Sequence, residues 1–238
     1  MARLAIRKSP AREIARGFCL FPRYDPGMGK AFRPWLLALT GCALFCLVSV
    51  LFIDRPVAAF FDTPPHARHV IGMWLRAVPF VIALGVLAIF WSRIRRHFGR
   101  PPSTRLMALS RAGVAAALAW AVNDLLLKPA FGRFNLDGLA SGHYGFVPFG
   151  HVMDPSFPSG HTAMTAAFLG VLWQIYPKLR PVHAAALAAL AFALMVARWH
   201  FLSDIAAGVF VGTATAALML KLWPVRITPI KEWSIFRG

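Results

Sequence analysis

The chain has 238 residues, of which 58% are hydrophobic and only 15% charged, and it carries a formal net charge of +17. This composition excludes intrinsic disorder, which requires a polar, charge-rich chain, and it is not typical of a soluble globule. It indicates an integral membrane protein, for which this length allows about five to seven spanning helices of roughly 20 residues each. The three cysteines are too few for a disulfide framework, and we interpret Cys42 and Cys46 as small core residues.

A basic tail, residues 1–34, precedes the apolar part of the chain and holds eight Lys or Arg residues and four prolines. The first apolar run, 35–53, has nineteen residues without a charge. It is too long for a typical signal-peptide core and no convincing cleavage site follows it, so we expect it to remain as a spanning helix. We therefore expect a membrane domain over 35–223, flanked by cytoplasmic tails at 1–34 and 224–238.

Five further apolar runs predict that the fold is all-α, a polytopic membrane protein with about six transmembrane helices. Ionisable groups within such runs normally face protein, so we expect Arg76 at an interface. Asp124 lies four residues before Lys128 and is expected to help position it. The six expected spans are 35–53, 71–92, 106–127, 162–177, 181–197 and 204–223.

Basic residues are distributed unevenly between the two sets of loops that six spans create. The segments 1–34, 93–105, 178–180 and 221–238 hold 19 Lys or Arg residues, whereas the loops 54–77, 128–161 and 198–204 hold 6. Because cytoplasmic loops are enriched in these residues, we expect both termini in the cytoplasm of a cell with an inner membrane. The second set of loops would then be periplasmic, and the positive charge would meet membrane lipids, with no role for nucleic acid.

The turn Ser159-Gly160-His161 leads directly into an apolar run of the sequence. A helix that begins here presents unpaired amides, and its glycine lets an anion approach the backbone closely. His161 would stand beside that anion, where an imidazole can donate a proton to a leaving oxygen. The same residues also fit an ordinary Ser N-cap followed by an interfacial histidine.

His200 and Asp204 are four residues apart, just before and within the last apolar run. On one helical turn the carboxylate can accept a hydrogen bond from Nδ1 of the imidazole, which leaves Nε2 free as a nucleophile. A single His–Asp pair is often structural, but this pair, the Ser-Gly-His turn and Lys128 all fall on the same predicted side of the membrane. Charge and spacing alone allow either His161 or His200 to be the nucleophile.

Metal ligands do not cluster along the sequence. There is no His-x-x-x-His spacing and no cysteine pair near a histidine, and the outer acids are scattered over three loops. We therefore expect a site without metal or cofactor, in which Lys and Arg side chains neutralise a phosphoryl group. The outer acids are Asp54, Asp62, Asp137, Asp154 and Asp204.

These motifs resemble the site of the type-2 phosphatidic acid phosphatases, membrane lipid-phosphate phosphatases whose site is shared with vanadium haloperoxidases. That family has a Lys followed seven residues later by Arg-Pro, then Pro-Ser-Gly-His, then Ser-Arg, with a His six residues after that Arg and an Asp four beyond. Lys128, the segment Pro158-Ser159-Gly160-His161 and the pair His200 and Asp204 fall on this pattern. The resemblance covers roughly 125–212 and is strongest to bacterial members.

The sequence departs from the family pattern at two arginines. Asn135 and Leu194 stand where the family has its arginines, while Arg133 and Arg198 lie a few residues away. The resemblance implies that His200 attacks phosphorus to give a phosphohistidine, that Asp204 orients it, and that His161 protonates the departing alcohol. The residues expected to hold the phosphate oxygens are Lys128, Arg133, Ser159, Gly160 and Arg198.

The sequence therefore predicts a membrane phosphatase that hydrolyses a lipid phosphate monoester or pyrophosphate on the outer face. A phospholipid, a polyprenyl pyrophosphate or a lipid A phosphate is the expected substrate partner. Two alternatives remain open: a lipid phosphotransferase on the same scaffold, and a non-catalytic lipid-binding or transport relative. No oligomeric state is predicted.

Overall fold

The computed structural model describes residues 28–61 and 64–223, with side chains from residue 33 onward. Most of the expected N-terminal tail and all of the expected C-terminal tail, 224–238, lie outside the described residues. The chain divides into two units, Met1–Ala38 and Leu39–Gly238. In the first unit only the beginning of one helix is described, so the bundle and its sites belong to the second.

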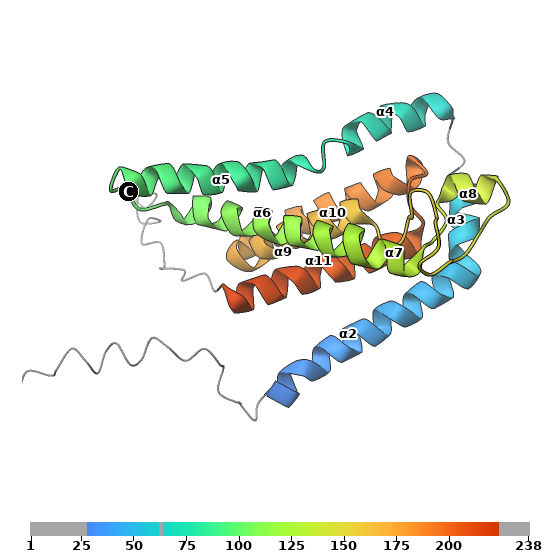
Figure 1. Ribbon diagram of the computed structural model, residues 1–238, viewed down its shortest axis with the longest axis horizontal. Helices are drawn as coiled ribbons and strands as arrows, with labels where there is room; N and C mark the ends of the chain where they lie inside the picture. Colours follow the sequence, from blue (N-terminus) through green and yellow to red (C-terminus); the bar gives the residue numbers. More distant parts are fainter. Residues whose placement is uncertain (1–27, 62–63, 224–238) are drawn as a thin grey trace, which may run out of the picture. The chain divides into compact units, whose positions relative to one another are not determined.

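The described part of the chain is almost entirely helical (Figure 1), and its only β-type pairing is an isolated bridge between Arg133 and Phe146. The long helices correspond to the predicted apolar runs, while short helices and turns fill the outer loops. The elements are α2 (Met28–Val48), η1 (Ser49–Ile53), α3 (Asp54–Phe60), α4 (Pro65–Leu75), α5 (Phe80–His97), α6 (Thr104–Val122), η2 (Asn123–Leu127), α7 (Lys128–Phe131), α8 (Leu136–Ala140), α9 (Gly160–Ile175), η3 (Pro177–Leu179), α10 (Arg180–Val196) and α11 (Leu202–Leu222).

Five helical stretches among the described residues are long and apolar enough to cross a membrane. The expectation of an all-helical, polytopic membrane protein is thereby confirmed. The fourth expected span, 162–177, is the helix α9, which has 16 residues and falls short of that length. The five stretches are Arg33–Phe60, Pro65–His97, Thr104–Phe131, Pro177–Val196 and Leu202–Leu222.

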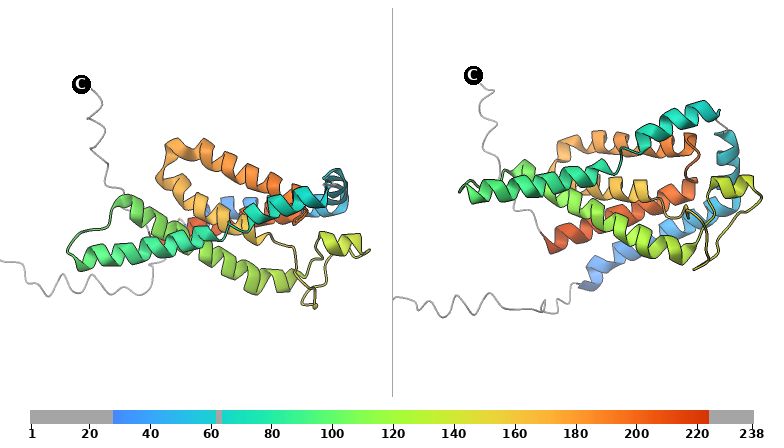
Figure 2. Two further views of the ribbon diagram at one scale, coloured as in Figure 1. Left: turned by 90° about the horizontal axis from the view of Figure 1, so that it is seen from above. Right: turned by 45° about the horizontal axis from the view of Figure 1, so that its top comes forward.

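The helix α9 is short because it lies inside the protein. It packs against α6, α10 and α11 (Figure 2), and more than half of its residues are buried. At 1.5 Å per residue it extends for roughly 24 Å, less than the ~30 Å of a bilayer core. A helix enclosed by protein does not have to match the bilayer, because its ends are satisfied by neighbouring loops.

Small residues bring α9 and α11 into close contact. A Cβ atom added to Gly208 would lie 2.6 Å from the carbonyl oxygen of Ser159, and one added to Gly212 would lie 2.3 Å from that of Ala163. The two glycines are four residues apart on one face of α11, an arrangement that lets membrane helices approach backbone to backbone. This contact fixes the start of α9 beside the start of α11, where the two predicted histidine motifs lie.

One end of the bundle is built from the short elements α3, α7 and α8 and from the first turns of α9 and α11 (Figure 1). Gly132 ends α7 in the left-handed region at φ 56°, and a Cβ atom there would lie 2.0 Å from the carbonyl oxygen of Val147. Only glycine fits this turn. Because the chain reverses at Gly132, the next residue, Arg133, enters the interior of the bundle.

Candidate active site

A cavity of about 370 Å³ opens at this end of the bundle and is lined by half of the predicted site residues. Three of its lining residues are basic, two are histidines and two are aspartates. A concave site with convergent charged groups is the usual setting of an enzyme active site. These lining residues are Arg76, Lys128, Arg198, His161, His200, Asp137 and Asp154.

Ser159 is the N-cap of α9. Its hydroxyl accepts a hydrogen bond from the amide of Thr162 at 3.3 Å and another from the Thr162 hydroxyl at 2.9 Å. Its own amide donates to the carbonyl oxygen of Asp204 at 3.0 Å, and its side chain is fully buried. The predicted phosphate contact from the Ser159 amide is therefore already occupied within the protein. The amides of Gly160 and His161 are the first of the helix and have no helical acceptor.

His161 lies in the first turn of α9 and faces the last histidine motif. Its ring centroid is 6.2 Å from that of His200 and 5.4 Å from that of Trp199. Burial, followed by the charges of His200 and Lys128, lowers the pKa of His161 from 6.5 to about 4. The imidazole is therefore neutral near pH 7 while the cavity holds no anion.

His200 is buried, with 8% of its surface exposed, and it lies directly before the α11 N-terminus. Its Nδ1 atom is 3.7 Å from Oδ2 of Asp204, which is too long for a hydrogen bond. That carboxylate oxygen instead accepts a hydrogen bond from the amide of Phe201 at 2.9 Å. The predicted orienting hydrogen bond is thus not formed here, and Nδ1 of His200 has no hydrogen-bond partner among the described residues.

Arg133 forms a buried cluster of charges behind the cavity. Its guanidinium, with no exposed surface, donates to Asp204 and, at 2.6 Å, to the hydroxyl of Ser203. It also donates to Asp54 at 2.7 Å, and Asp54 accepts from both the amide and the hydroxyl of Ser203. Burial alone would lower the pKa of Arg133, but the carboxylates of Asp204 and Asp54 hold it above its usual value.

The cluster joins three parts of the chain that are distant in sequence. Asp54 begins α3, Arg133 follows α7, and Ser203 and Asp204 lie in the first turn of α11. Because both oxygens of Asp204 accept hydrogen bonds within the protein, its position is fixed, and with it the start of the helix beside His200. Arg133 does not line the cavity, so the structure separates it from the other basic residues that were predicted to bind phosphate.

Lys128 reaches the cavity from the start of α7. Its ammonium is 2.8 Å from a carboxylate oxygen of Asp124, one helical turn earlier, so the predicted pairing of these two residues is confirmed. Both side chains keep about a fifth of their surface exposed. Asp124 also lies near the α9 N-terminus, because a Cβ atom on Gly160 would be 3.4 Å from its carboxylate.

Two arginines complete the basic lining of the cavity. Arg198 has the left-handed backbone angle φ 58°, and one of its nitrogens donates to the carbonyl oxygen of Ala58 at 3.2 Å. Arg76 ends α4 at the break before α5, and sequence reasoning placed it at an interface without assigning it to the site. The signal was present in the sequence, because an arginine shortly before Pro79 interrupts a long apolar run.

Packing explains how Arg76 reaches the cavity. Leu75 belongs to a buried cluster with residues of α10 and α11. Gly72 lies against Trp199, because a Cβ atom added to Gly72 would be 3.1 Å from the Trp199 ring. Asn135, which stands where the family has an arginine, also lines the cavity, and its side-chain oxygen caps α8 by accepting from the Gly138 amide at 2.9 Å.

The arrangement is suited to phosphoryl transfer. Two imidazoles lie close enough for one phosphoryl group to contact both, and three basic side chains face the same space. Among the described residues, no group of three His, Cys, Asp or Glu side chains could hold a metal ion.

Comparisons with known proteins identify relatives of this site. A family model for the PAP2 superfamily matches residues 108–227. The lipid A 1-phosphatase of Rhizobium johnstonii is 27% identical over 218 residues, which cover 83% of this chain and 88% of that protein. The lipid A 1-phosphatase of Rhizobium etli is 29% identical over 175 residues, covering 69% and 75% respectively. A crystal structure of a transmembrane PAP2 type phosphatidylglycerolphosphate phosphatase from Bacillus subtilis has 16% identity and a TM-score of 0.48, and covers 79% of this chain and 94% of its own.

Proposed function

The chain belongs to the PAP2 superfamily, as its motifs predicted, and on that premise we propose that it is a lipid phosphatase that removes the 1-phosphate of lipid A. The membrane lipid phosphatase assignment rests on the family and on relatives that match most of the chain. The observation that supports the chemistry is the pair of facing histidines, 6.2 Å apart between ring centroids, in a cavity lined by three basic residues.

In the first step, Nε2 of His200 attacks phosphorus. A nitrogen–phosphorus bond forms as the bond from phosphorus to the sugar oxygen breaks, and that oxygen takes a proton from His161. Lys128, Arg76 and Arg198 stabilise the charge on the phosphoryl oxygens, and the first amides of α9 donate to them. Because buried His161 is neutral, the proton that it donates is either carried by the substrate phosphate or taken up when the phosphate binds.

In the second step, water attacks the phosphohistidine. His161, left neutral by the first step, accepts a proton from that water while the nitrogen–phosphorus bond breaks and inorganic phosphate forms. Asp204 does not contact the substrate in this scheme. Its carboxylate, held by Arg133 and the Phe201 amide, positions His200 and favours the positive charge that develops on the imidazole as Nε2 bonds to phosphorus.

The proposed orientation puts the cavity on the periplasmic side of the inner membrane and both termini in the cytoplasm. It rests on the unequal distribution of Lys and Arg between the two sets of loops. A reporter inserted near Gly142 should therefore be external, whereas one inserted near Pro101 should be cytoplasmic. A cytoplasmic signal at Gly142 would place the cavity on the cytoplasmic side of the membrane and overturn this orientation.

The test is phosphate release by the full chain, purified in detergent with EDTA present. Lipid A 1-phosphate, a phosphatidylglycerophosphate and a polyprenyl pyrophosphate should be compared, and lipid A 1-phosphate should give the highest kcat/KM. His200→Ala should reduce turnover to background on every substrate, whereas His151→Ala, an exposed histidine of the same outer loops, should not. A preference for another lipid would overturn the substrate assignment, and activity that requires added magnesium would overturn the metal-free mechanism.

The covalent step has its own measurement. Enzyme mixed with labelled substrate and denatured at alkaline pH, where nitrogen-linked phosphate survives, should carry label in the wild type and lose it in His200→Ala. Label that persists in His200→Ala but is absent from His161→Ala would exchange the roles of the two histidines. Transfer of label to an added lipid alcohol without release of inorganic phosphate would make the enzyme a phosphotransferase.

A further inference from the structure

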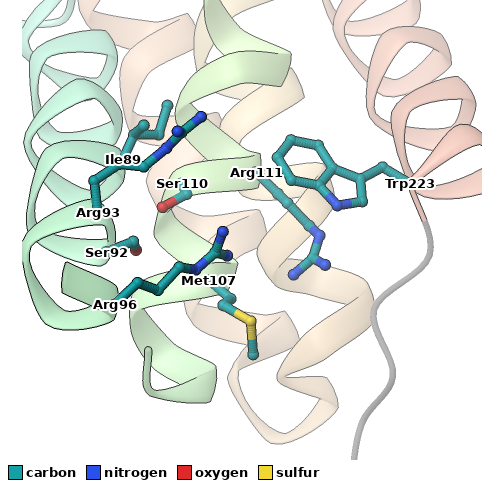
Figure 3. Close-up of a pocket in the computed structure, with 8 residues that line it drawn as sticks. All are labelled: Ile89, Ser92, Arg93, Arg96, Met107, Ser110, Arg111 and Trp223. Atoms are coloured by element: carbon teal, nitrogen blue, oxygen red, sulfur yellow. The ribbon is translucent and has the colours of Figure 1, made fainter. Parts of the chain in front are cut away.

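A second basic pocket lies at the opposite end of the bundle from the candidate active site (Figure 3). It has a volume of about 170 Å³ and is formed between the last turns of α5, the second turn of α6 and the end of α11. Arg93 and Arg96 extend from α5, Arg111 from α6, and Trp223 lies beyond α11. Since α6 leads through η2 to Lys128, the two basic sites are separated by the full length of one spanning helix.

Arg111 is the central residue of this pocket. It is buried, with only 8% of its surface exposed, and its Nε and Nη1 atoms have no hydrogen-bond partner in the described part of the chain. Its guanidinium lies over the ring of Trp223, with a distance of 5.0 Å to the centroid. A buried guanidinium without an anionic partner is strongly unfavourable, so its retention indicates that a ligand supplies the missing charge.

No described residue at this end can supply that charge. None of the residues that line the pocket is acidic. The hydroxyls of Ser92 and Ser110, the other polar groups of the lining, donate to carbonyl oxygens of their own helices at 2.7 and 2.8 Å. The described acidic residues all belong to the outer end of the bundle, and they are Asp54, Asp124, Asp137, Asp154 and Asp204.

The pocket has the chemistry and the surroundings of a lipid phosphate site. Arginine guanidinium groups bind phosphate through paired N–H donors, and three arginines line this pocket. On α5, the helix of Arg93 and Arg96, the side chains of Val86, Leu87 and Phe90 are each about 60% exposed. Acyl chains would cover this apolar surface. Basic pockets between spanning helices at the membrane surface are typical headgroup sites.

We propose that this pocket binds the phosphate of an anionic phospholipid in the leaflet opposite the active site, with Arg111 as the principal contact and Arg93 and Arg96 as the outer contacts. The proposal does not depend on the reaction at the other end. The lipid would stabilise the packing of α5 on α6, which is held at its closest point by backbone contact between Gly85 and Gly113.

The experiment measures the thermal unfolding midpoint of the full chain in a zwitterionic detergent, titrated with phosphatidylglycerol or with phosphatidylcholine of the same acyl chains. Phosphatidylglycerol should raise the midpoint of the wild type and phosphatidylcholine should not. Arg111→Gln should be at least as stable as the wild type without lipid, because it removes an unpaired buried charge, and should need roughly tenfold more phosphatidylglycerol for half of the stabilisation.

Two further variants keep the test decisive. Arg96→Gln, on an exposed residue of the pocket, should weaken the response to phosphatidylglycerol without affecting folding. Arg105→Gln, on an exposed arginine in the first turn of α6 that does not line the pocket, should leave the response unchanged. Phosphate release in lipid-free detergent should be the same in all three variants. An unchanged lipid response in both Arg111→Gln and Arg96→Gln would overturn the proposal. Equal stabilisation by inorganic phosphate would mean that the pocket binds a free anion and not a lipid headgroup.

Discussion

Lys128 and Arg133 lie close together in the sequence, but the ion pairs that they form differ in burial. The pair of Arg133 with Asp204 has no exposed surface, whereas the pair of Lys128 with Asp124 keeps 18% and 21% of its side-chain surface exposed. A dry pair cannot exchange its partner without leaving a buried charge. A pair that keeps about a fifth of its surface exposed at the edge of a cavity can exchange its carboxylate for another anion. Burial therefore separates the two pairs, and in the proposed mechanism Arg133 supports the site while Lys128 contacts the phosphate.

The largest expected effect is the loss of stability on removing the buried pair of Arg133 with Asp204. Arg133→Met leaves Asp54 and Asp204 buried without their common partner, and we expect a loss of about 3–5 kcal/mol in the free energy of unfolding. The measurement is the thermal unfolding midpoint in detergent. Arg55→Met removes an exposed arginine next to the cluster and should change the midpoint little. An Arg133→Met protein that stays stable but fails to bind phosphate would place Arg133 in the binding site after all.

Removing the partly exposed pair of Lys128 with Asp124 should affect activity and not stability. Lys128→Met should fold with an almost unchanged unfolding midpoint, yet lower kcat/KM by roughly 10²–10³, the loss typical when one group that stabilises developing charge is removed. Steady-state rates on the lipid substrate provide the measurement. Lys221→Met, which removes an exposed lysine at the far end of α11, is the matched control. If stability falls as much as activity, the distinction between the two pairs fails.

Much of this architecture could be predicted from the sequence, because the signals are local. Apolar runs give the helices, and the Pro-Ser-Gly-His segment gives the start of α9. The tertiary partners could not be predicted. Nothing in the spacing shows that Asp54 and Asp204, 150 residues apart, share Arg133, since their meeting depends on how α3 and α11 pack.

The same limit explains Arg76. Its place in the cavity depends on the break between α4 and α5 and on the packing of Leu75 and Gly72, none of which has a signature in a linear motif. A search restricted to the family spacing finds Asn135 and Leu194 where arginines are expected. The structure supplies a basic side chain to the cavity from a different helix.

The third prediction tests that replacement. Arg76→Met should lower kcat/KM by roughly tenfold, less than Lys128→Met, because an exposed cation in a wet site is partly screened. Arg76→Lys should recover much of the loss, and Arg68→Met, on the same helix but outside the cavity, should be close to the wild type. An unchanged kcat/KM in Arg76→Met would leave the cavity with two functional cations.

The smallest effect concerns pH and separates the proton donor from the cations. With the cavity empty, the pKa of His161 is lowered to about 4, so between pH 5 and 8 the proton for the leaving group comes with the substrate, whose monoester phosphate has a second pKa of about 6. As pH rises above that value this proton is lost, and kcat/KM on the lipid should fall by at most about tenfold per pH unit.

His161→Ala should remove this pH dependence as well as lowering the rate on the lipid, because no group remains to relay the proton. With an activated aryl phosphate, whose leaving group needs no proton, the wild type and His161→Ala should have similar kcat/KM values and similar pH profiles. This ratio covers the steps up to departure of the leaving group and excludes the attack of water. The measurement is kcat/KM from pH 5 to 8 for both proteins on both substrates. The opposite outcome is a wild-type kcat/KM that rises through pH 6–7, with the rise absent in His161→Ala. It would show that His161 has an ordinary pKa and acts first as a base. His161 would then activate water and would not protonate the lipid oxygen.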